Sequence, residues 1–562
     1  MNKKVKEFLF PALITIPFLL IYYYLALPAI NLRSFGFWFV IFITALVFVG
    51  SHMFLNKREV LKKLAYQKIN LSEANKRKND KRDVIIDPDA LFIPKWVKIT
   101  LISIGSAVVL AILLCFFTSS KVFRAKDYQK MLTVTESNFD EDIAELPFNQ
   151  IPVVDRDTAE RLGNRKIGEV VELVSQFNVG SYYSQINYKG EPHRVTPLEY
   201  AGILKWFTNK DEGIPYYVRI NMATQNTELV ELAEGMKYSP SEYFNRDLER
   251  HIRFAYPTKM FENLSFEIDD KDHPYWVMSY YNYTFGIVGG KDIKGVILVD
   301  AVTGEMTDYL ISEVPQWIDL AYSPELIVEQ ADNWGSYKNG FFNSIFVQKN
   351  VVVTTEGYNY IAVNDDVWLY TGITSVVSDE SNIGFILVNM RTKEAKTYMI
   401  NGAEEYSAME SAQGQIQEKS YMATFPILIN VADRPTYFIS LKDNAGLVKS
   451  YAFVSVAEYQ IVGVADTIEG AKDEYLRLLG VSSETPLPDI DDTVENVGVV
   501  ERIATAVKDG NSLYYIKLTD DSTVYIASIN VSDVLPLIVE GNSVKIKINA
   551  RSEVVSVEFV AE

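Results

Sequence analysis

Histidine and cysteine, which often act as general bases, nucleophiles or metal ligands, are scarce in this chain. Its 562 residues include four histidines and one cysteine, namely His52, His193, His251, His273 and Cys115. Their spacing fits no zinc-binding pattern, and the chain has no Gly-x-Ser-x-Gly elbow, phosphate-binding loop or kinase motif. His251 lies among Arg and Glu residues, which favours a surface or interface histidine over a general base. We therefore expect neither an enzyme nor a bound metal or cofactor.

Carboxylates could still do chemistry, because glycoside hydrolysis requires only two of them at the correct separation. The chain has three clusters: Asp269, Asp270 and Asp272; Asp365 and Asp366; and Asp489, Asp491 and Asp492. Each cluster falls where a turn or a linker is expected, and aspartate is common there for backbone reasons. A catalytic pair and a weak calcium site stay open as alternatives, although no twelve-residue calcium loop with a terminal glutamate occurs.

Aromatic residues form a third candidate group. Most of them fit the cores of strands. Gly335 and Gly340 flank Tyr337, however, and can mark an exposed loop. A sugar ring or a peptide could stack on such a loop through Trp334, Tyr337 and Phe341, which are the candidate ligand-binding residues.

Three long apolar stretches precede all of these residues, at 8–30, 35–51 and 99–117. A run of about 18 or more apolar residues can cross the bilayer as a helix. The first run is too long for a cleaved signal peptide, and no small-residue cleavage site follows it. The second is short enough for a re-entrant or interfacial segment to stay an alternative. We predict a transmembrane hairpin over residues 1–55 and a third transmembrane helix over 98–118.

The positions of Lys and Arg predict how these helices are oriented. Lys3, Lys4 and Lys6 precede the first span, and residues 56–97 form a loop rich in Lys and Arg. By the positive-inside rule, the N-terminus and this loop are cytoplasmic, and the third span exports the C-terminal part. Anionic lipids are the expected partners of the basic loop, with polybasic DNA binding as the weaker alternative.

The charge balance supports this division. Residues 1–121 hold 17 Lys and Arg against 7 Asp and Glu, whereas the rest of the chain holds 37 against 66. A body this acidic is a poor nucleic-acid binder. Because Cys115 lies within the third span, the exported part has no disulfide, which favours a bacterial cell envelope with a single membrane.

Small residues recur every four positions on the third span, at Ser103, Ala107 and Ala111. Such a pattern lets another helix approach closely. The neighbouring helix is either one of the first two spans or belongs to a second copy or another membrane protein.

The exported part begins with a charged stalk at residues 119–148, and an α+β body follows over 149–480. Alternating aromatic and β-branched residues predict strands, and helices are expected at 157–175, 197–208, 239–256 and 467–479. A turn recurs in this body: Asn or Asp, two residues, then Thr, between two alternating strands. Its copies contain Asn221 and Thr224; Asp300, Thr303, Gly304 and Glu305; and Asn389 and Thr392, with a looser fourth copy around Asp443. The side-chain oxygen of the first residue can accept backbone N–H groups and close the turn.

The segment Val299-Asp300-Ala-Val-Thr303-Gly304-Glu305 resembles the signature hairpin of the PepSY family, in which a helix packs on a short antiparallel sheet. The resemblance implies tandem α+β units that inhibit, chaperone or sense an extracellular partner. The whole body is also similar to large membrane proteins of Firmicutes, a resemblance that implies no activity.

The C-terminal end differs in composition. Residues 481–496 are polar, acidic and proline-bearing, as in a linker, and five alternating strands over 497–562 resemble a small OB-like barrel. Together these features predict a non-enzymatic, multi-pass membrane protein of the bacterial envelope. Its extracytoplasmic domain would act as a scaffold that binds an envelope protein partner, a second copy of the chain in a homo-oligomer, or a wall polymer. The alternative is an accessory or regulatory subunit of a membrane machine.

Overall fold

The computed structural model describes residues 3–55, 95–363, 365–376, 381–480, 494–508, 511–519, 521, 523–528, 531–532, 534–548 and 554–560. The chain divides into two compact units, Met1–Ala471 and Lys472–Glu562. Most of the predicted basic loop at 56–97 and most of the predicted linker at 481–496 lie outside the described residues.

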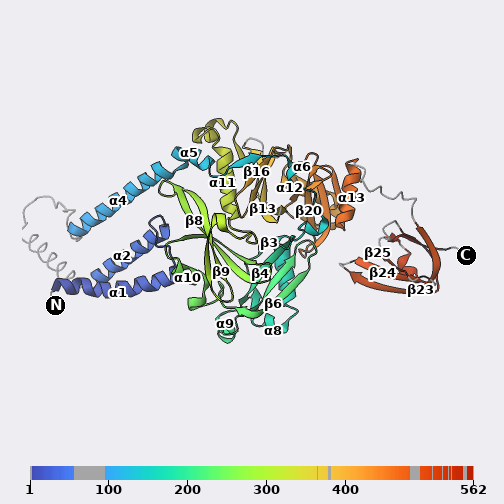
Figure 1. Cartoon of the computed structure of the whole chain (residues 1–562), viewed down its shortest axis with the longest axis horizontal. Coiled ribbons are helices and arrows are strands. Elements are labelled where there is room, and N and C mark those ends of the chain that lie inside the picture. Colours follow the sequence, from blue (N-terminus) through green and yellow to red (C-terminus); the bar gives the residue numbers. More distant parts are fainter. Residues whose placement is uncertain are drawn as a thin grey trace, which may run out of the picture. The chain divides into compact units, whose positions relative to one another are not determined.

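The three apolar stretches form helices that are long and apolar enough to cross a membrane, as predicted: α1 (Lys3–Ala26), α2 (Phe35–Leu55) and α4 (Lys95–Ser119) (Figure 1). The second stretch forms a helix of 21 residues, which is long enough to cross the hydrocarbon layer. Most large apolar side chains on these helices are exposed, as expected of surfaces covered by lipid. Helices α1 and α2 pack on each other, whereas the main contacts of α4 are with α5 and β9.

The segment after α4, predicted to be a stalk, packs against the rest of the N-terminal unit. Its strand β1 pairs in parallel with β16, and Leu132 is fully buried in the core. The amide of Asn430 also donates to the carbonyl of Ile143 at 2.8 Å. The elements of this segment are α5 (Lys121–Gln129), β1 (Val134–Glu136), α6 (Phe139–Asp142) and η2 (Phe148–Gln150).

The rest of the N-terminal unit contains four modules, each a helix followed by an antiparallel sheet. Module 1 comprises α7 (Arg156–Ile167), α8 (Val171–Val174), β2 (Phe177–Val179), β3 (Ser184–Tyr188), β4 (Glu191–Tyr200), α9 (Ile203–Asn209), β5 (Ile214–Asn221) and β6 (Thr227–Met236). Module 2 comprises η3 (Phe244–Arg246), α10 (Leu248–Ala255), β7 (Met260–Ile268), β8 (Pro274–Phe285), β9 (Gly289–Asp300) and β10 (Met306–Leu310).

Module 3 comprises η4 (Ile311–Glu313), α11 (Pro324–Ser336), the π-helix η5 (Asn343–Val347), β11 (Val352–Thr354), β12 (Asn359–Val363), β13 (Asp366–Ser375), β14 (Ser381–Asn382), β15 (Gly384–Asn389) and β16 (Ala395–Tyr398). Module 4 comprises β17 (Gly402–Ala403), α12 (Glu405–Gln415), η6 (Gln417–Lys419), β18 (Met422–Ala423), β19 (Ile427–Val431), β20 (Arg434–Lys442), β21 (Val448–Ser455) and β22 (Val462–Ala465). Helix α13 (Ile468–Leu478) follows.

One backbone hydrogen bond recurs within every module. The last hairpin of each module closes with a turn. The carbonyl of the second residue of that turn accepts a hydrogen bond from the segment that precedes the helix of the same module. Val153 N–H donates to the carbonyl of Met222 at 2.9 Å, and Ala403 N–H donates to that of Val456 at 2.9 Å. The carbonyls of Ala301 and Met390 accept in the same way in modules 2 and 3. This recurrence supports four copies of one design. One buried cluster contains residues of module 2, of helix α11 and of the sheet of module 3, among them Val277, Ile327 and Val388.

Some predicted helices are wrong in part. Residues up to Tyr200 belong to β4, so the helix expected at 197–208 begins only at Ile203. The first half of the helix expected at 239–256 is mostly irregular, and α11 and α12 were not expected.

The C-terminal unit contains five antiparallel strands in the order β25-β24-β23-β26-β27. They are β23 (Val494–Lys508), β24 (Asn511–Leu518), β25 (Val524–Ser528), β26 (Ser543–Ile548) and β27 (Val554–Phe559), with η8 (Leu535–Leu537) before β26. No ladder joins β25 to β27 among the described residues, so the sheet is not a closed barrel there.

Candidate functional site

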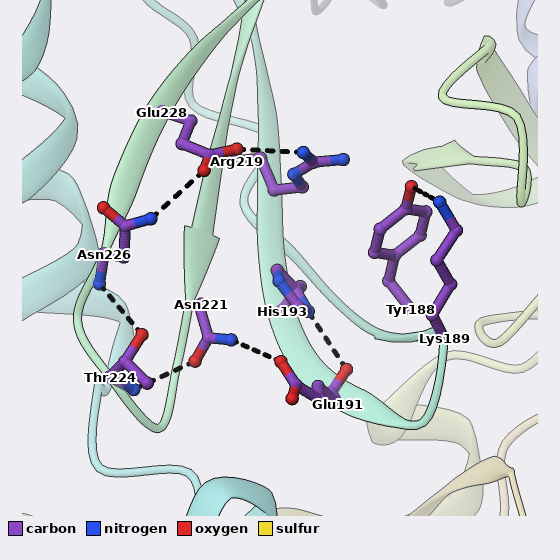
Figure 2. Close-up of a pocket in the computed structure, with 9 residues that line it drawn as sticks. All are labelled: Tyr188, Lys189, Glu191, His193, Arg219, Asn221, Thr224, Asn226 and Glu228. Carbon is purple, nitrogen blue, oxygen red and sulfur yellow. Dashed lines mark hydrogen bonds and ion pairs between the residues drawn. The ribbon is translucent and has the colours of Figure 1, made fainter.

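A polar pocket of about 360 Å³ lies on the sheet of module 1 (Figure 2). Two hairpin turns bring its walls together: the turn between β3 and β4 and the turn between β5 and β6. The pocket is lined by Tyr188, Lys189, Glu191, His193, Arg219, Asn221, Thr224, Asn226 and Glu228.

The first turn is a tight two-residue hairpin loop. Tyr188 pairs with Glu191, and the residues between them, Lys189 and Gly190, have φ angles of +54° and +80°. Positive φ at both central residues is the geometry whose twist matches the flanking strands. The turn therefore holds the side chains of Tyr188, Lys189 and Glu191 at one end of the sheet.

Arg219 is the central cation of the site. It pairs with Glu228 across β5 and β6, and its Nη2 donates to Glu228 Oε2 at 2.9 Å. Its Nη1 donates to Asp272, which comes from the β7–β8 turn of module 2. Tyr188 also donates its hydroxyl to Asp272, at 2.6 Å. One guanidinium thus joins two carboxylates from neighbouring modules.

These contacts also fix the charge states. Burial raises the pKa of Asp272, but the Tyr188 hydrogen bond and the Arg219 charge outweigh it, so the pKa is lowered overall. The Tyr188 ring lies between two cations: Lys189 Nζ is 4.4 Å and the Arg219 guanidinium carbon 4.9 Å from its centroid. The Lys189 ammonium also donates to the Tyr188 hydroxyl.

His193 is a nearly buried neutral base in the pocket wall. Its Nδ1 lies 3.1 Å from the carbonyl oxygen of Glu191, so Nδ1 carries the proton and Nε2 is left as an acceptor. Burial lowers the pKa of His193, which keeps the imidazole uncharged at neutral pH. Asn221 donates to Glu191 Oε2 at 2.7 Å, which fixes the carboxylate beside the histidine.

The opposite wall is held in the same manner. Asn226 donates from Nδ2 to Glu228 Oε1 at 3.1 Å, and its backbone N–H donates to Thr224 Oγ1 at 3.4 Å. The pocket therefore presents fixed donors and acceptors and both signs of charge. Such a lining suits a polar ligand that carries hydroxyl, amide or charged groups.

The pocket is lined by charged, amide and hydroxyl groups and one imidazole, and it contains no serine or cysteine. Within the part of the chain that the structure describes, no group of three or more His, Cys, Asp or Glu residues could hold a metal ion. Because its donors, acceptors and charges are held in fixed positions, the arrangement can bind a polar ligand.

A second acidic pair lies in the protein interior. Glu267 and Asp319 are both buried, and Glu267 accepts hydrogen bonds from the backbone N–H groups of Asp319 and Leu320 at 2.8 and 3.2 Å. Asp319 in turn accepts one from Asn187 N–H at 2.7 Å. Burial raises the pKa of Glu267 to about 7, and burial together with the charge of Glu267 raises that of Asp319. These contacts join modules 1 and 2 to the segment before α11, and burial separates the pair from any substrate.

Three of the turns identified in the sequence have one geometry. Asn221 Oδ1 accepts from the N–H groups of residues 223 and 224 at 3.0 and 2.9 Å. Asp300 Oδ1 accepts from residues 302 and 303 at 2.8 and 2.9 Å, and Asn389 Oδ1 from residues 391 and 392 at 2.9 and 2.9 Å. The hydroxyls of Thr224, Thr303 and Thr392 each accept the N–H two residues further on.

Only the first of these turns contributes to the pocket. Asn221 and Thr224 line it, whereas the turns at Asp300 and Asn389 close equivalent hairpins in modules 2 and 3. Gly304 has a φ of +76°, and its carbonyl lies 2.8 Å from His251 Nε2 of α10. The exposed side chain of Glu305 follows that turn, and its backbone N–H donates to Thr303.

The fourth turn is not at Asp443. That residue closes the β20–β21 hairpin, with its Oδ1 accepting from Ala445 and Leu447 N–H. The position equivalent to Asn221 is Ser455, because the next residue, Val456, offers the recurring carbonyl. Ser455 Oγ accepts from Glu458 N–H at 3.2 Å, so a hydroxyl replaces the amide or carboxylate.

The predicted aromatic ligand loop is divided between two elements. Trp334 belongs to helix α11, where it packs against the core with Lys338 Nζ 4.0 Å from its ring centroid. Tyr337 follows the helix and stacks on Phe341, with ring centroids 6.2 Å apart. These residues lie in module 3 and do not line the polar pocket.

The small residues of the third span lie on α4. This helix contacts mainly α5 and β9, and not α1 or α2. Ser103 and Ala111 are exposed there; Ala107 is on the same helix. The face that they mark is therefore not used by the first two spans.

The pocket residues that the sequence did not single out are Lys189, Glu191, Arg219, Asn226 and Glu228. The Lys-Gly pair between two alternating strands was a local signal for the first turn. No local signal places Asp272 beside Arg219, because the two residues are 53 positions apart and meet across modules.

Comparisons with known proteins assign no family. No protein-family model and no curated protein matches the chain. One similar solved structure is a crystal structure of an ACO/RPE65 chimera, at 10% identity over 70% of this chain and 64% of that chain, with a TM-score of 0.14. Two mutants of B. megaterium levansucrase match at 9% identity over 76% of this chain and 95% and 97% of theirs, both with TM-scores of 0.17. TM-scores this low carry no argument about fold or function.

Proposed function

We propose that this protein is a non-enzymatic, membrane-anchored binding protein of the bacterial envelope. Its β-rich part faces the outside, with the N-terminus and the basic loop in the cytoplasm. The pocket of module 1 binds a polar segment of an envelope protein or a wall polymer. The observation that carries this proposal is the fixed network around Arg219, which presents both signs of charge in one preformed pocket.

The finer architecture belongs to the same proposal. Four helix-and-sheet modules with one recurring turn support PepSY-like repeats, and the five-stranded C-terminal sheet supports an OB-like docking module. Both kinds of module would contribute contacts to a partner and not to catalysis.

A crosslinked pull-down of the full chain from its native membrane tests the proposal. Arg219→Ala removes the guanidinium that bridges Glu228 and Asp272, so we expect a stoichiometric protein or wall fragment to be lost. Glu228→Gln should weaken its capture as well. Arg165→Ala is the matched control, because Arg165 is an exposed arginine of α7 outside the pocket. Equal capture by the wild type and both pocket variants would contradict the assignment of the pocket.

A second role rests on the third span. The exposed Ser103 and Ala111 of α4 offer a small-residue face to a helix of another membrane protein, as an accessory subunit would. Replacing Ser103, Ala107 and Ala111 with Leu should release a co-purifying membrane partner and leave capture through the pocket unchanged.

A further inference from the structure

An exposed apolar segment follows helix α11. Phe342, Ile345, Phe346 and Val347 have 65%, 50%, 76% and 71% of their surface exposed. Four large apolar side chains within six residues form a patch that soluble surfaces usually avoid.

The backbone holds these side chains outward in an ordered turn. Gln348 N–H donates to the carbonyl of Asn343 at 2.7 Å, which closes the π-helix η5. The amides of Asn339 and Asn343 both donate to the carbonyl of Lys349, at 2.9 and 3.0 Å. The rings of Phe342 and Phe346 stack with centroids 6.4 Å apart. The exposed patch therefore belongs to an ordered, hydrogen-bonded segment of the chain.

The segment is attached to the end of the third span. Helix α5 directly continues from α4 and packs on α11, with an ion pair of 3.1 Å between Lys121 and Glu329. Tyr337 stacks on Phe341, and the ring of Phe341 packs edge-on against the exposed Phe342. Figure 1 shows this segment, in olive, beside α5.

The charges around the patch suit a membrane surface. Lys338 and Lys349 flank it, and both are exposed. Helix α5 adds the exposed Lys126 at the same end of the span, whereas its Lys121 and Arg124 pair with Glu329 and Asp127. Exposed apolar side chains flanked by lysines are typical of segments that lie in the interface of an anionic bilayer.

We propose that Phe342, Ile345, Phe346 and Val347 form an interfacial anchor that inserts into the headgroup and upper acyl region of the membrane crossed by α4. The occupant of this patch is lipid. The anchor adds a contact beyond the three spans and fixes module 3 at the bilayer surface. This inference is independent of the pocket of module 1.

Depth-dependent fluorescence quenching tests the anchor. The full chain is prepared with Cys115→Ser and Val347→Cys, labelled with an environment-sensitive probe and reconstituted in nanodiscs that contain anionic lipid and doxyl-labelled lipid. The control is Val171→Cys in the same background, because Val171 is 75% exposed on α8, which packs on α7 and β2. Cys115 itself, labelled in the wild type, reports the lipid-embedded limit.

We expect quenching at position 347 to exceed that at 171 by at least about threefold, with blue-shifted emission. Phe342→Ser with Phe346→Ser should abolish the difference without lowering the thermal unfolding temperature, since both rings are exposed. Equal quenching at 347 and 171, or quenching that persists in the double variant, would overturn the proposal. Shielding of the probe by a second copy or a protein partner without lipid quenching would overturn it too.

Discussion

Ser119, the last residue of α4, accepts a hydrogen bond on its Oγ from the backbone N–H of Val288 at 3.0 Å. The N–H of Ile287 donates to the same oxygen at 3.0 Å, so the tip of the β8–β9 hairpin is fixed on the end of the third span. The turn between α1 and α2 reaches the same hairpin, because Arg33 Nη1 donates to the carbonyl of Tyr283 at 3.1 Å. The sheet of module 2 therefore attaches the β-rich part to all three membrane helices.

Ser119→Ala should loosen this attachment. The N–H groups of Ile287 and Val288 would lose their shared acceptor, which should lower the free energy of local opening of the hairpin by about 1–2 kcal/mol. Amide hydrogen exchange at residues 285–290 should become faster, while the unfolding temperature changes little. Ser120→Ala is the control, because the buried Ser120 hydroxyl has no hydrogen-bond partner among the described residues. An equal change in exchange for both variants would rule out a specific role for Ser119.

Stability should depend on the buried pair Glu267 and Asp319. Both carboxyl groups have pKa values raised above their unfolded values, Glu267 to about 7. Their contribution to stability is therefore complete below the unfolded pKa values and is lost as the pH rises through the folded ones. Asp319→Asn keeps an acceptor for Asn187 N–H and removes one charge. We expect it to raise the free energy of unfolding by about 1–2 kcal/mol near pH 8 and to flatten the decline in unfolding temperature between about pH 5 and 8.

The control for this titration is Asp211→Asn, since Asp211 is exposed beside Lys210. That variant should retain the wild-type dependence of unfolding temperature on pH. A wild-type protein whose stability rises over the same pH range would contradict the assignment to the buried pair.

Asn389→Ala should destabilise module 3 by about 2 kcal/mol, because two backbone N–H groups lose their buried acceptor. Asn389 Nδ2 also donates to Asp366 Oδ2 at 2.9 Å, and that contact would disappear as well. Chemical denaturation of the full chain in detergent would measure the effect. Asn444→Ala, at an exposed position of the β20–β21 turn, should change stability by a few tenths of a kcal/mol at most.

Alanine substitutions at Gly304 and Gly190 should distinguish the cost of backbone strain from the cost of a steric clash. Gly304 and Gly190 have φ angles of +76° and +80°, so alanine should cost about 1 kcal/mol of strain at either position. A Cβ at Gly304 would lie 2.3 Å from the ring of Tyr238, whereas one at Gly190 would meet nothing within 4 Å. Gly304→Ala should therefore lower the unfolding temperature clearly more than Gly190→Ala. Equal losses would show that the Tyr238 ring moves aside at little cost.

Much of the module architecture followed from local chemistry. Asn221, Asp300 and Asn389 are followed three residues later by Thr, and a side-chain oxygen at that spacing reaches the same two N–H groups wherever it occurs. The fourth copy does not follow this pattern, because Ser455 is neither Asn nor Asp and is not followed by Thr three residues later. Its equivalence became visible only through the carbonyl of Val456, which depends on how the chain returns to its own helix.

The sequence analysis did not predict helix α11, for a different reason. Ser323 and Pro324 form a typical helix start, and Ser323 Oγ accepts from Leu326 N–H. The glycines around Tyr337 favoured a loop instead, so Trp334 was assigned to a ligand surface. Burial of the helix against the core decided the outcome, and burial is not a local property of the sequence.

The sequence by itself determined the three membrane helices, the acidic β-rich part and the recurring turns, because hydrophobic length and short-range hydrogen bonding act within a few residues. Only the tertiary structure decided the polar pocket of module 1 and the place of the exposed apolar patch. Arg219 meets Asp272 because two modules pack side by side, and the patch at Phe346 lies beside α5 because α11 packs on it. Both arrangements depend on contacts between distant segments, which no local pattern encodes.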